Sequence, residues 1–178
     1  MLSLCGSQAQ PVPDRVAAHY AAAFAHRPVS PSIMDNVLND YFKVPIQVVQ
    51  HVGRWHPLEK RLQTGLGTQN CMLSGGAVLG SSMWRRDLVV VIRVGPLNKR
   101  QYDDFLKDST GAQALKHMLG MFETPTVSYE IQLILRAADV HGITLSASAP
   151  GTGARLGIDA FLSTEAAEAD RFDTRYMI

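Results

Sequence analysis

The stretch from Asp40 to Leu97 constrains the fold of this chain more than any other part of it. Gly, Pro and Trp recur there at the ends of apolar runs, in Gly53-Arg-Trp55, Gly76-Ala-Val-Leu-Gly80 and Gly95-Pro-Leu97. Gly permits unusual backbone angles and Pro has no amide hydrogen, so such residues mark turns and strand ends. The stretch therefore predicts a succession of strands and turns and contains no catalytic motif.

Two apolar segments predict the main strands of a sheet. Residues 88–94 form an unbroken run rich in Val and Ile, which is typical of a buried central strand, and this run stops at Gly95-Pro96. Residues 126–136 alternate apolar and polar side chains, which predicts a long strand with one buried face. Shorter strands are expected over residues 46–52, 143–145 and 155–162.

The predicted helices begin at capping residues and follow a 3.6-residue apolar period. The expected starts are Asp14, Ser30 with Pro31 after it, and Asn98 with Gln101 in the spacing of a capping box. The helices are expected over residues 15–26, from Pro31 to a point before Pro45, over a short segment after residue 98, and over 111–122. With the strands, they predict an α+β fold, in which a mixed or antiparallel sheet packs with three to four short helices.

The length of 178 residues indicates one domain, which buries about 70% of the surface of its unfolded chain. We expect residues 1–14 to be a flexible leader, residues 15–162 to be the single domain, and residues 163–178 to be an acidic, frayed tail. A long loop is expected over residues 54–74, because Pro57, Gly65 and Gly67 interrupt any period. Loops of this length are usually functional or disordered.

Composition and charge exclude several classes of function. The formal net charge is only +1, whereas a nucleic-acid binder usually has a basic excess or stripe. No apolar run approaches the roughly 20 residues that span a bilayer, so no membrane insertion is predicted. The two cysteines, Cys5 and Cys71, are too few for a disulfide framework and suit a reducing cytosol.

The sequence contains no strong pattern for catalysis or for a cofactor. The six histidines never lie three or four residues apart on a helix, as zinc sites of the His-Glu-x-x-His kind require. One enzymatic alternative stays open, a small cytoplasmic hydrolase that uses Cys71 or a histidine such as His51 or His56. A structural cysteine beneath the loop is the simpler interpretation, so we predict no enzyme, no metal and no cofactor.

Both tryptophans of the chain lie beside arginines, at the two ends of the predicted loop. Trp and Arg are enriched in interface hot spots, which makes these positions candidates for protein contacts. The candidate residues are Arg54, Trp55, Pro57, Leu58, Trp84, Arg85 and Arg86. The alternative is that each Trp folds back to close the core, with one partner for its ring nitrogen. The sequence leaves both interpretations open.

The order of these motifs resembles the type VI secretion baseplate subunit TssG, also called the ImpH or VasB family. The resemblance covers about residues 15–162 and is carried by Tyr41, Phe42, Val44, Pro45, Val48, Gln50, Val52, Gly53, Trp55, Pro57, Leu58, Ala77, Val78, Leu79, Gly80, Trp84, Arg86, Gly95, Pro96 and Leu97. The chain departs from the family pattern in three places: His51 replaces a usual Phe, Arg85 replaces an acid, and the residues after Leu162 lack a clear family ending. The resemblance maps to the C-terminal half of longer family members, which indicates a truncated chain or a naturally short relative.

The resemblance implies a structural role, without catalysis or a cofactor, in a contractile injection system. TssG-like proteins join TssF in the baseplate wedges and bind TssK, and contacts with TssE and the spike are also expected. The implied location is the cytoplasm, at the inner-membrane face, with no nucleic-acid partner. We expect the loop over residues 54–74, with Trp55, to contact these subunits. Apolar surface around Tyr20 and Phe24 and on residues 88–94 also predicts a homodimer of the isolated chain.

Overall fold

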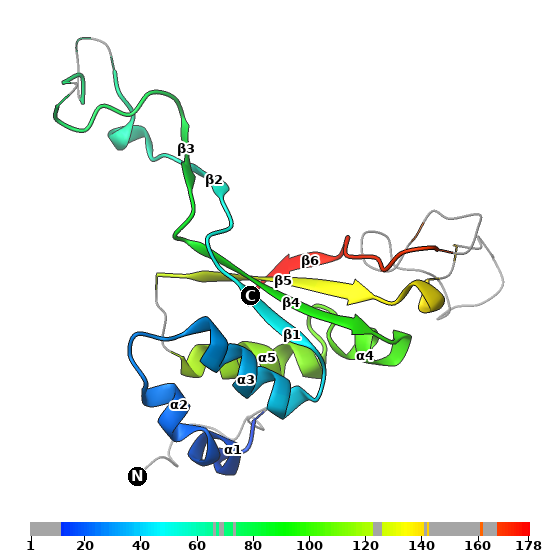
Figure 1. The fold of residues 1–178 in the computed structure, drawn as a ribbon. Helices are drawn as coiled ribbons and strands as arrows, with labels where there is room; N and C mark the ends of the chain where they lie inside the picture. Colours follow the sequence, from blue (N-terminus) through cyan, green and yellow to red (C-terminus); the bar gives the residue numbers. More distant parts are fainter. Residues whose placement is uncertain are drawn as a thin grey trace.

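The computed structural model describes residues 12–65, 67, 70–72, 74–122, 126–140, 142, 161 and 167–178. A four-stranded sheet carries helices on one face, and a separate two-stranded ribbon projects away from it (Figure 1). The predicted α+β class with a mixed sheet is confirmed. The elements in chain order are α1 (Asp14–His19), α2 (Ala21–Ala25), α3 (Pro31–Phe42), β1 (Ile46–Val49), β2 (Arg54–Pro57), η1 (Lys60–Leu62), β3 (Ser82–Arg85), β4 (Val89–Leu97), α4 (Lys99–Asp104), α5 (Thr110–Met121), β5 (Ser128–Leu135), η2 (Ala137–Asp139) and β6 (Arg175–Met177).

The main sheet has the strand order β1-β4-β5-β6. Strands β4 and β5 are parallel, while β1 and β6 pair antiparallel with their neighbours. Helices α4 and α5 connect β4 to β5, because parallel strands need a crossover connection. The capping box predicted before α4 is confirmed: the Asn98 side chain accepts from the Gln101 amide, and the Gln101 side chain accepts from the Asn98 amide.

Strand β4 does not stop at Gly95-Pro96 as predicted, but continues to Leu97. The register with β5 shifts between Val94 and Leu97, and Gly95 has a φ of 132°. Glycine adopts this backbone angle without a steric cost, so the strand passes through an irregularity here and does not end. The Gly95 amide still donates to the Pro45 carbonyl at 2.8 Å.

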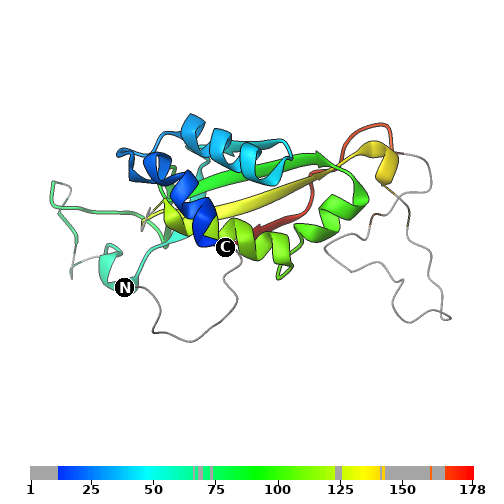
Figure 2. The ribbon, with the colours of Figure 1, turned by 90° about the horizontal axis from the view of Figure 1, so that it is seen from below.

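The core lies between the sheet and the helices, which cover one face of it (Figure 2). Alternate residues of β4 and β5 point into this core, as a period of two requires. The most deeply buried side chains include Leu38 of α3, Ile92, Val94 and Leu97 of β4, Leu115, Met118 and Leu119 of α5, Phe122, and Ile131 and Leu133 of β5. Strand β5 was predicted to bury one face, but Glu130 and Gln132 on its other face are also buried, at 6% and 4% exposed.

The helix predicted over residues 15–26 is two short helices, α1 and α2, which meet at Tyr20. Asp14 is the first helical residue and not the cap, because Pro13 before it already has the extended backbone of a cap position. The Tyr20 hydroxyl donates a hydrogen bond to Asp40 of α3, and this tertiary contact lies at the break between the helices. The helix predicted from Ser30 is confirmed as α3, with Ser30 at the cap.

The predicted long loop over residues 54–74 is wrong at its beginning. Residues 54–57 form β2, which pairs with β3 after an intervening loop, and η1 follows β2. The strand predicted over 46–52 is shorter, and ends at Val49. The strands predicted over 143–145 and 155–162 lie outside the described residues, apart from Phe161, which forms an isolated bridge with Gly142.

The two ends of the chain also differ from the prediction where the structure describes them. Residues 1–11 of the predicted leader lie outside the described residues, but Val12 is buried in the core. The end of the predicted frayed tail forms β6 on the edge of β5. The Tyr176 hydroxyl donates to the Phe105 carbonyl at 2.6 Å, and burial raises the pKa of Tyr176 above its ordinary value. A tertiary partner therefore orders a segment with little local pattern.

Candidate protein-interaction arm

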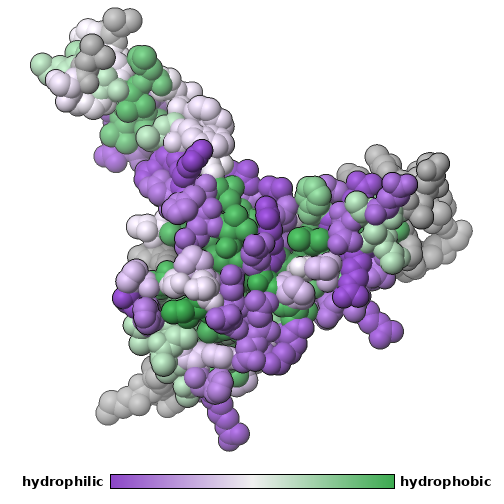
Figure 3. Space-filling view, viewed as in Figure 1, coloured by the Kyte–Doolittle hydropathy of each residue, from purple (hydrophilic) through white to green (hydrophobic). Residues whose placement is uncertain are grey.

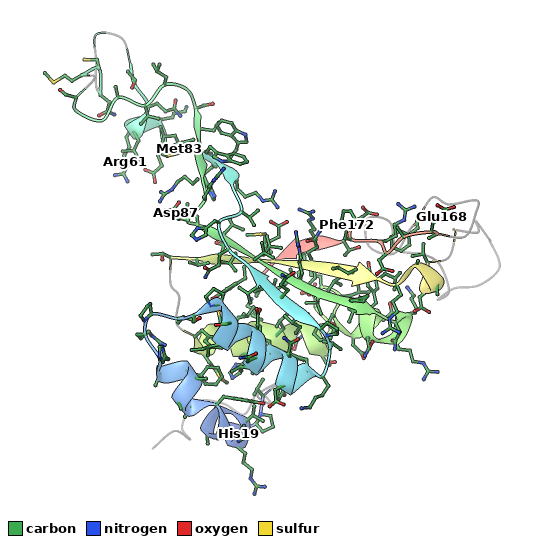
Figure 4. The ribbon with its side chains drawn as sticks, in the orientation of Figure 1. His19, Arg61, Met83, Asp87, Glu168 and Phe172 are labelled. Atoms are coloured by element: carbon green, nitrogen blue, oxygen red, sulfur yellow. The ribbon has the colours of Figure 1, made fainter. Side chains whose placement is uncertain are left out.

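The ribbon of β2 and β3 and the residues between them project from the main sheet, and we call residues 54–85 the arm (Figure 1). The two strands are antiparallel, with Arg54 opposite Arg85 and Trp55 opposite Trp84. Figure 4 shows Arg61 and Met83 on the arm and Asp87 at its root. Beyond the strands, the Leu58 amide donates to the Ser81 carbonyl at 2.8 Å, which extends the pairing toward the tip.

The two tryptophans form a cross-strand pair on one face of the arm. Their ring centroids lie 5.4 Å apart with an interplanar angle of 67°, an edge-to-face arrangement that aromatic rings favour. Trp55 is 67% exposed and Trp84 is 50% exposed. These fractions contradict the alternative that each Trp closes the core, since neither ring is buried in it. The pair instead offers two large, mutually supported rings to solvent.

Large exposed apolar side chains are most numerous on the arm. Figure 3 shows hydrophobic residues on the arm as well as on the body of the domain. In the described part of the chain, seven large apolar side chains are exposed, and five of them belong to the arm: Trp55, Leu62, Met72, Leu79 and Trp84. Single exposed apolar residues are normal on a soluble protein, but a group of them marks a surface for interaction. The arm is therefore the strongest candidate for a protein contact.

The opposite face of the arm carries two arginines, each of which is paired with a carboxylate. Alternation along the strands places Arg54, His56, Met83 and Arg85 on this face. Arg85 forms a two-pronged ion pair with Asp87, one contact being 3.0 Å between Nε and Oδ1, and this hydrogen bonding lowers the pKa of Asp87. The Nε2 atom of His56 is buried and has no hydrogen-bond partner among the described residues.

The base of the arm is fixed to the main sheet by an ion pair. The Arg54 guanidinium donates to the Glu130 carboxylate through Nη2 to Oε1 at 2.6 Å and through Nε to Oε2 at 3.1 Å. Glu130 lies in β5, 76 residues further along the chain. Two donors from one planar guanidinium define an orientation as well as a distance, so this contact restrains the direction in which β2 leaves the sheet.

Gly53 lies where the arm begins, and the indole of Trp84 covers its backbone. A Cβ atom placed on Gly53 would lie 2.1 Å from Cζ2 and 2.5 Å from Nε1 of Trp84. Real Cβ atoms do not approach other atoms so closely. The absence of a side chain at this position therefore allows Trp84 to lie against the first residues of the arm.

The structure brings together some of the predicted contact residues and separates others. Trp55 and Trp84 share one face with exposed Pro57, while Arg54 and Arg85 lie on the other. Leu58 is half-buried just after β2, and Arg86 is exposed just after β3. Sequence reasoning named Gly53 only as a turn residue and a match to the family pattern, and did not count Gly53 or Glu130 among the contact residues. A glycine directly before Arg-Trp was the available signal for the first, whereas Glu130 was assigned to the solvent-facing side of its strand.

The enzymatic alternative depends on Cys71 or a histidine. Among the described residues, no group of three or more His, Cys, Asp or Glu side chains is arranged to hold a metal ion. Cys71 is exposed on the arm. A shallow hollow of about 540 Å³ lies along α5 and is lined in part by His117 and Lys116, and a smaller one of about 140 Å³ lies beside Tyr176. Neither hollow includes Cys71. In the same residues, no helix is long and apolar enough to cross a membrane.

The chain is similar to proteins of one secretion machine. The family model for type VI secretion, TssG, matches residues 1–163. A chain of the type VI secretion TssK-TssF-TssG baseplate subcomplex, revealed by cryo-electron microscopy, shares the fold with a TM-score of 0.71 at 15% identity, over 93% of this chain and 70% of that one. A chain of the baseplate complex from the type VI secretion system has a TM-score of 0.64 at 16% identity, over 99% of this chain and 50% of that one. No curated protein sequence matches significantly.

Proposed function

Since this chain belongs to the TssG family of type VI secretion proteins, we propose that it is a structural subunit of the baseplate and that its arm binds another baseplate subunit. The observation that carries the proposal is the exposed Trp55–Trp84 pair on a ribbon that projects from the domain. The role needs no cofactor and no catalytic step. TssF and TssK accompany TssG in the subcomplex with the similar fold, so they are the first partners to test.

The physical argument rests on the composition of the arm. Trp side chains that become buried in an interface supply large contact areas with few rotatable bonds, and Trp and Arg dominate measured hot spots. The arm presents the tryptophans on one face, whereas Arg54 and Arg85 on the other face are paired with Glu130 and Asp87, so the tryptophans are the anchors that a partner meets first. In a symmetric baseplate, several such contacts act together, which increases the overall affinity.

Contacts with TssE and with the spike extend the same proposal, as does a location in the cytoplasm at the inner-membrane face. Both follow from the family and would be tested in the assembled baseplate. Binding of the arm to a single subunit is the part of the proposal that can be tested with purified proteins.

The experiment is co-purification and affinity measurement of this chain with TssF and with TssK from the same organism. Trp55→Ala is expected to weaken binding to the arm's partner by about 2 kcal/mol or more, roughly thirtyfold in the dissociation constant. Phe172→Ala is the matched control, because Phe172 is another exposed aromatic, at 56%, and lies outside the arm. The control is expected to bind like the unchanged chain.

Two results would contradict the proposal. If the folded, unchanged chain binds neither TssF nor TssK, the domain is not an independent binding module of the baseplate. If Trp55→Ala and Phe172→Ala bind equally well, the contact lies elsewhere than on the arm.

A further inference from the structure

One buried carboxylate connects three separate parts of the chain. Glu130 of β5 is 6% exposed and accepts from Arg54 at the first residue of the arm. Arg175 of β6 lies on its other side, with Nη1 3.5 Å from Oε1. Both arginines remain partly exposed, at 39% and 43% of their side chains, whereas the carboxylate that they share does not.

Besides the Arg54–Glu130 pair, the arm is joined to the body by its two chain connections and by Trp84, which packs on Gly53. Its two strands form a sheet of their own and do not pair with the four strands of the main sheet. Within the described residues, the root of the arm also contains the Arg85–Asp87 ion pair. That pair joins residues only two positions apart, so it does not connect the arm to the main sheet. The Arg54–Glu130 contact, in contrast, bridges the arm and a central strand.

The energetics of burial make this contact more than a surface ion pair. A buried carboxylate that loses one partner remains desolvated and uncompensated, so breaking the pair is far costlier than breaking an exposed one. The two-pronged geometry also excludes most rotations of the Arg54 side chain relative to β5. If the ribbon were loosely attached, Arg54 would neither compensate the buried charge of Glu130 nor keep its two-pronged geometry.

Strand β6 takes part in the same arrangement, although it lies beyond residues 1–163 that match the family. It is fixed to the body independently of the arm, since the Ile178 amide donates to the Tyr129 carbonyl at 3.0 Å and the Tyr176 hydroxyl donates to Phe105. Arg175 therefore approaches Glu130 from a strand that is fixed to the body, whereas Arg54 approaches it from the arm.

We propose that Glu130 is the positioning residue of the arm, and that Arg54 and Arg175 together hold its carboxylate so that the arm leaves the sheet in one fixed direction. Its effect on partner binding rests on the function proposed above. The effect on the direction of the arm does not, because it is a property of the isolated chain.

The first experiment measures the spread of arm directions in the full chain without any partner. A Cys5→Ser, Lys116→Cys background leaves one thiol on the arm, Cys71, and one on α5, and both sites are exposed. Nitroxide labels on these two thiols report the distance distribution by pulsed electron paramagnetic resonance. Glu130→Gln removes the charge with almost no change of shape, and is expected to widen the distribution at least about twofold.

Asp87→Asn is the matched control, because it removes the same charge from the other root of the arm but breaks only the local pair with Arg85. It is expected to leave the width unchanged. Arg54→Lys keeps the charge and loses the two-pronged geometry, so it tests the same point if Glu130→Gln fails to fold. A distribution of unchanged width in both variants would overturn the proposal, and an unchanged width in Arg175→Gln would remove β6 from it.

The second experiment measures affinity for the subunit that binds the unchanged chain. A mobile arm must be ordered on binding, so Glu130→Gln is expected to bind about tenfold more weakly, equivalent to about 1.4 kcal/mol. Wider distances with undiminished affinity would show that the direction of the arm does not control binding. A chain that binds no subunit at all would refute the proposed function and leave the distance measurement to stand alone.

Discussion

Gly53→Ala tests whether the close approach of Trp84 to the start of the arm is required for the tryptophan pair. The new Cβ would lie 2.1 Å from Cζ2 of Trp84, whereas carbon atoms in contact lie about 3.5 Å apart or more. The indole must therefore retreat by roughly 1.4 Å. It can do so, because Trp84 is 50% exposed and its ring is not enclosed by the core.

The expected effect on global stability is small. Loss of the edge-to-face contact costs about 0.5–1.5 kcal/mol, while alanine in place of glycine reduces the entropy of the unfolded chain by about 0.4–1 kcal/mol. The two terms nearly cancel, so the melting temperature should change by no more than about 4 °C. The arrangement of the rings, in contrast, should change completely.

Circular dichroism separates these two quantities. The chain has only two tryptophans, so any exciton coupling between indoles comes from the Trp55–Trp84 pair. Gly53→Ala should abolish the couplet and leave the thermal transition almost in place. Gly120→Ala is the control: Gly120 lies on α5 with open space around its Cβ position, so alanine should keep the couplet and stabilise the helix by about 0.5–1 kcal/mol. A full couplet in Gly53→Ala would refute the packing described for Trp84.

Three further outcomes are expected. Gly95→Ala should destabilise the protein by about 2 kcal/mol or more in urea unfolding, because Gly95 has a φ of 132° and its Cβ would lie 2.5 Å from the Ile134 carbonyl oxygen. A loss of stability below about 0.5 kcal/mol, the scale of a neutral surface change, would contradict this. Hydrogen bonding to Asp40 raises the pKa of Tyr20 to about 12, so the stability from this bond is present below pH 10.0 and lost as the pH approaches 12. Asp40→Asn should return the pKa toward 10.0 in a spectrophotometric titration, and an unchanged value would disprove the contact. Light scattering should show self-association of the isolated chain. A monomeric mass at concentrations up to about 100 μM, at which contacts of roughly −5 to −6 kcal/mol are detected, would contradict this expectation.

Local sequence patterns were sufficient to predict many of the helices and strands of the domain. The Asn98–Gln101 capping box, the Pro31 start of α3 and the apolar run of β4 all act within a few residues, so each is visible in the sequence and each appears in the structure. Where a pattern was interrupted, the prediction stopped early. Gly95 ended the predicted strand because a glycine can mark either a turn or an irregularity within a strand, and only the neighbouring β5 decides between them.

The candidate site was predicted in part. The two Arg-Trp motifs were recognised as interface anchors, and the structure places the tryptophans together in an exposed pair, whose binding role stays a prediction. The arm itself was not predicted, because residues 54–57 are too few to show a period of two and their partner strand begins 25 residues later, after Pro57. Pairing at such a separation depends on loop closure, which leaves no local pattern.

The sequence by itself determined the class of fold, the family and the alternation of core residues, because burial of an apolar face repeats along each helix and strand with a fixed period. Only the tertiary structure decided that Glu130 is buried, that the segment ending at Ile178 adds a strand, and that Trp84 lies over Gly53. Each of these depends on a partner far away in the chain. A carboxylate in a strand has the same local sequence whether water or a guanidinium faces it, so the fold supplies that information.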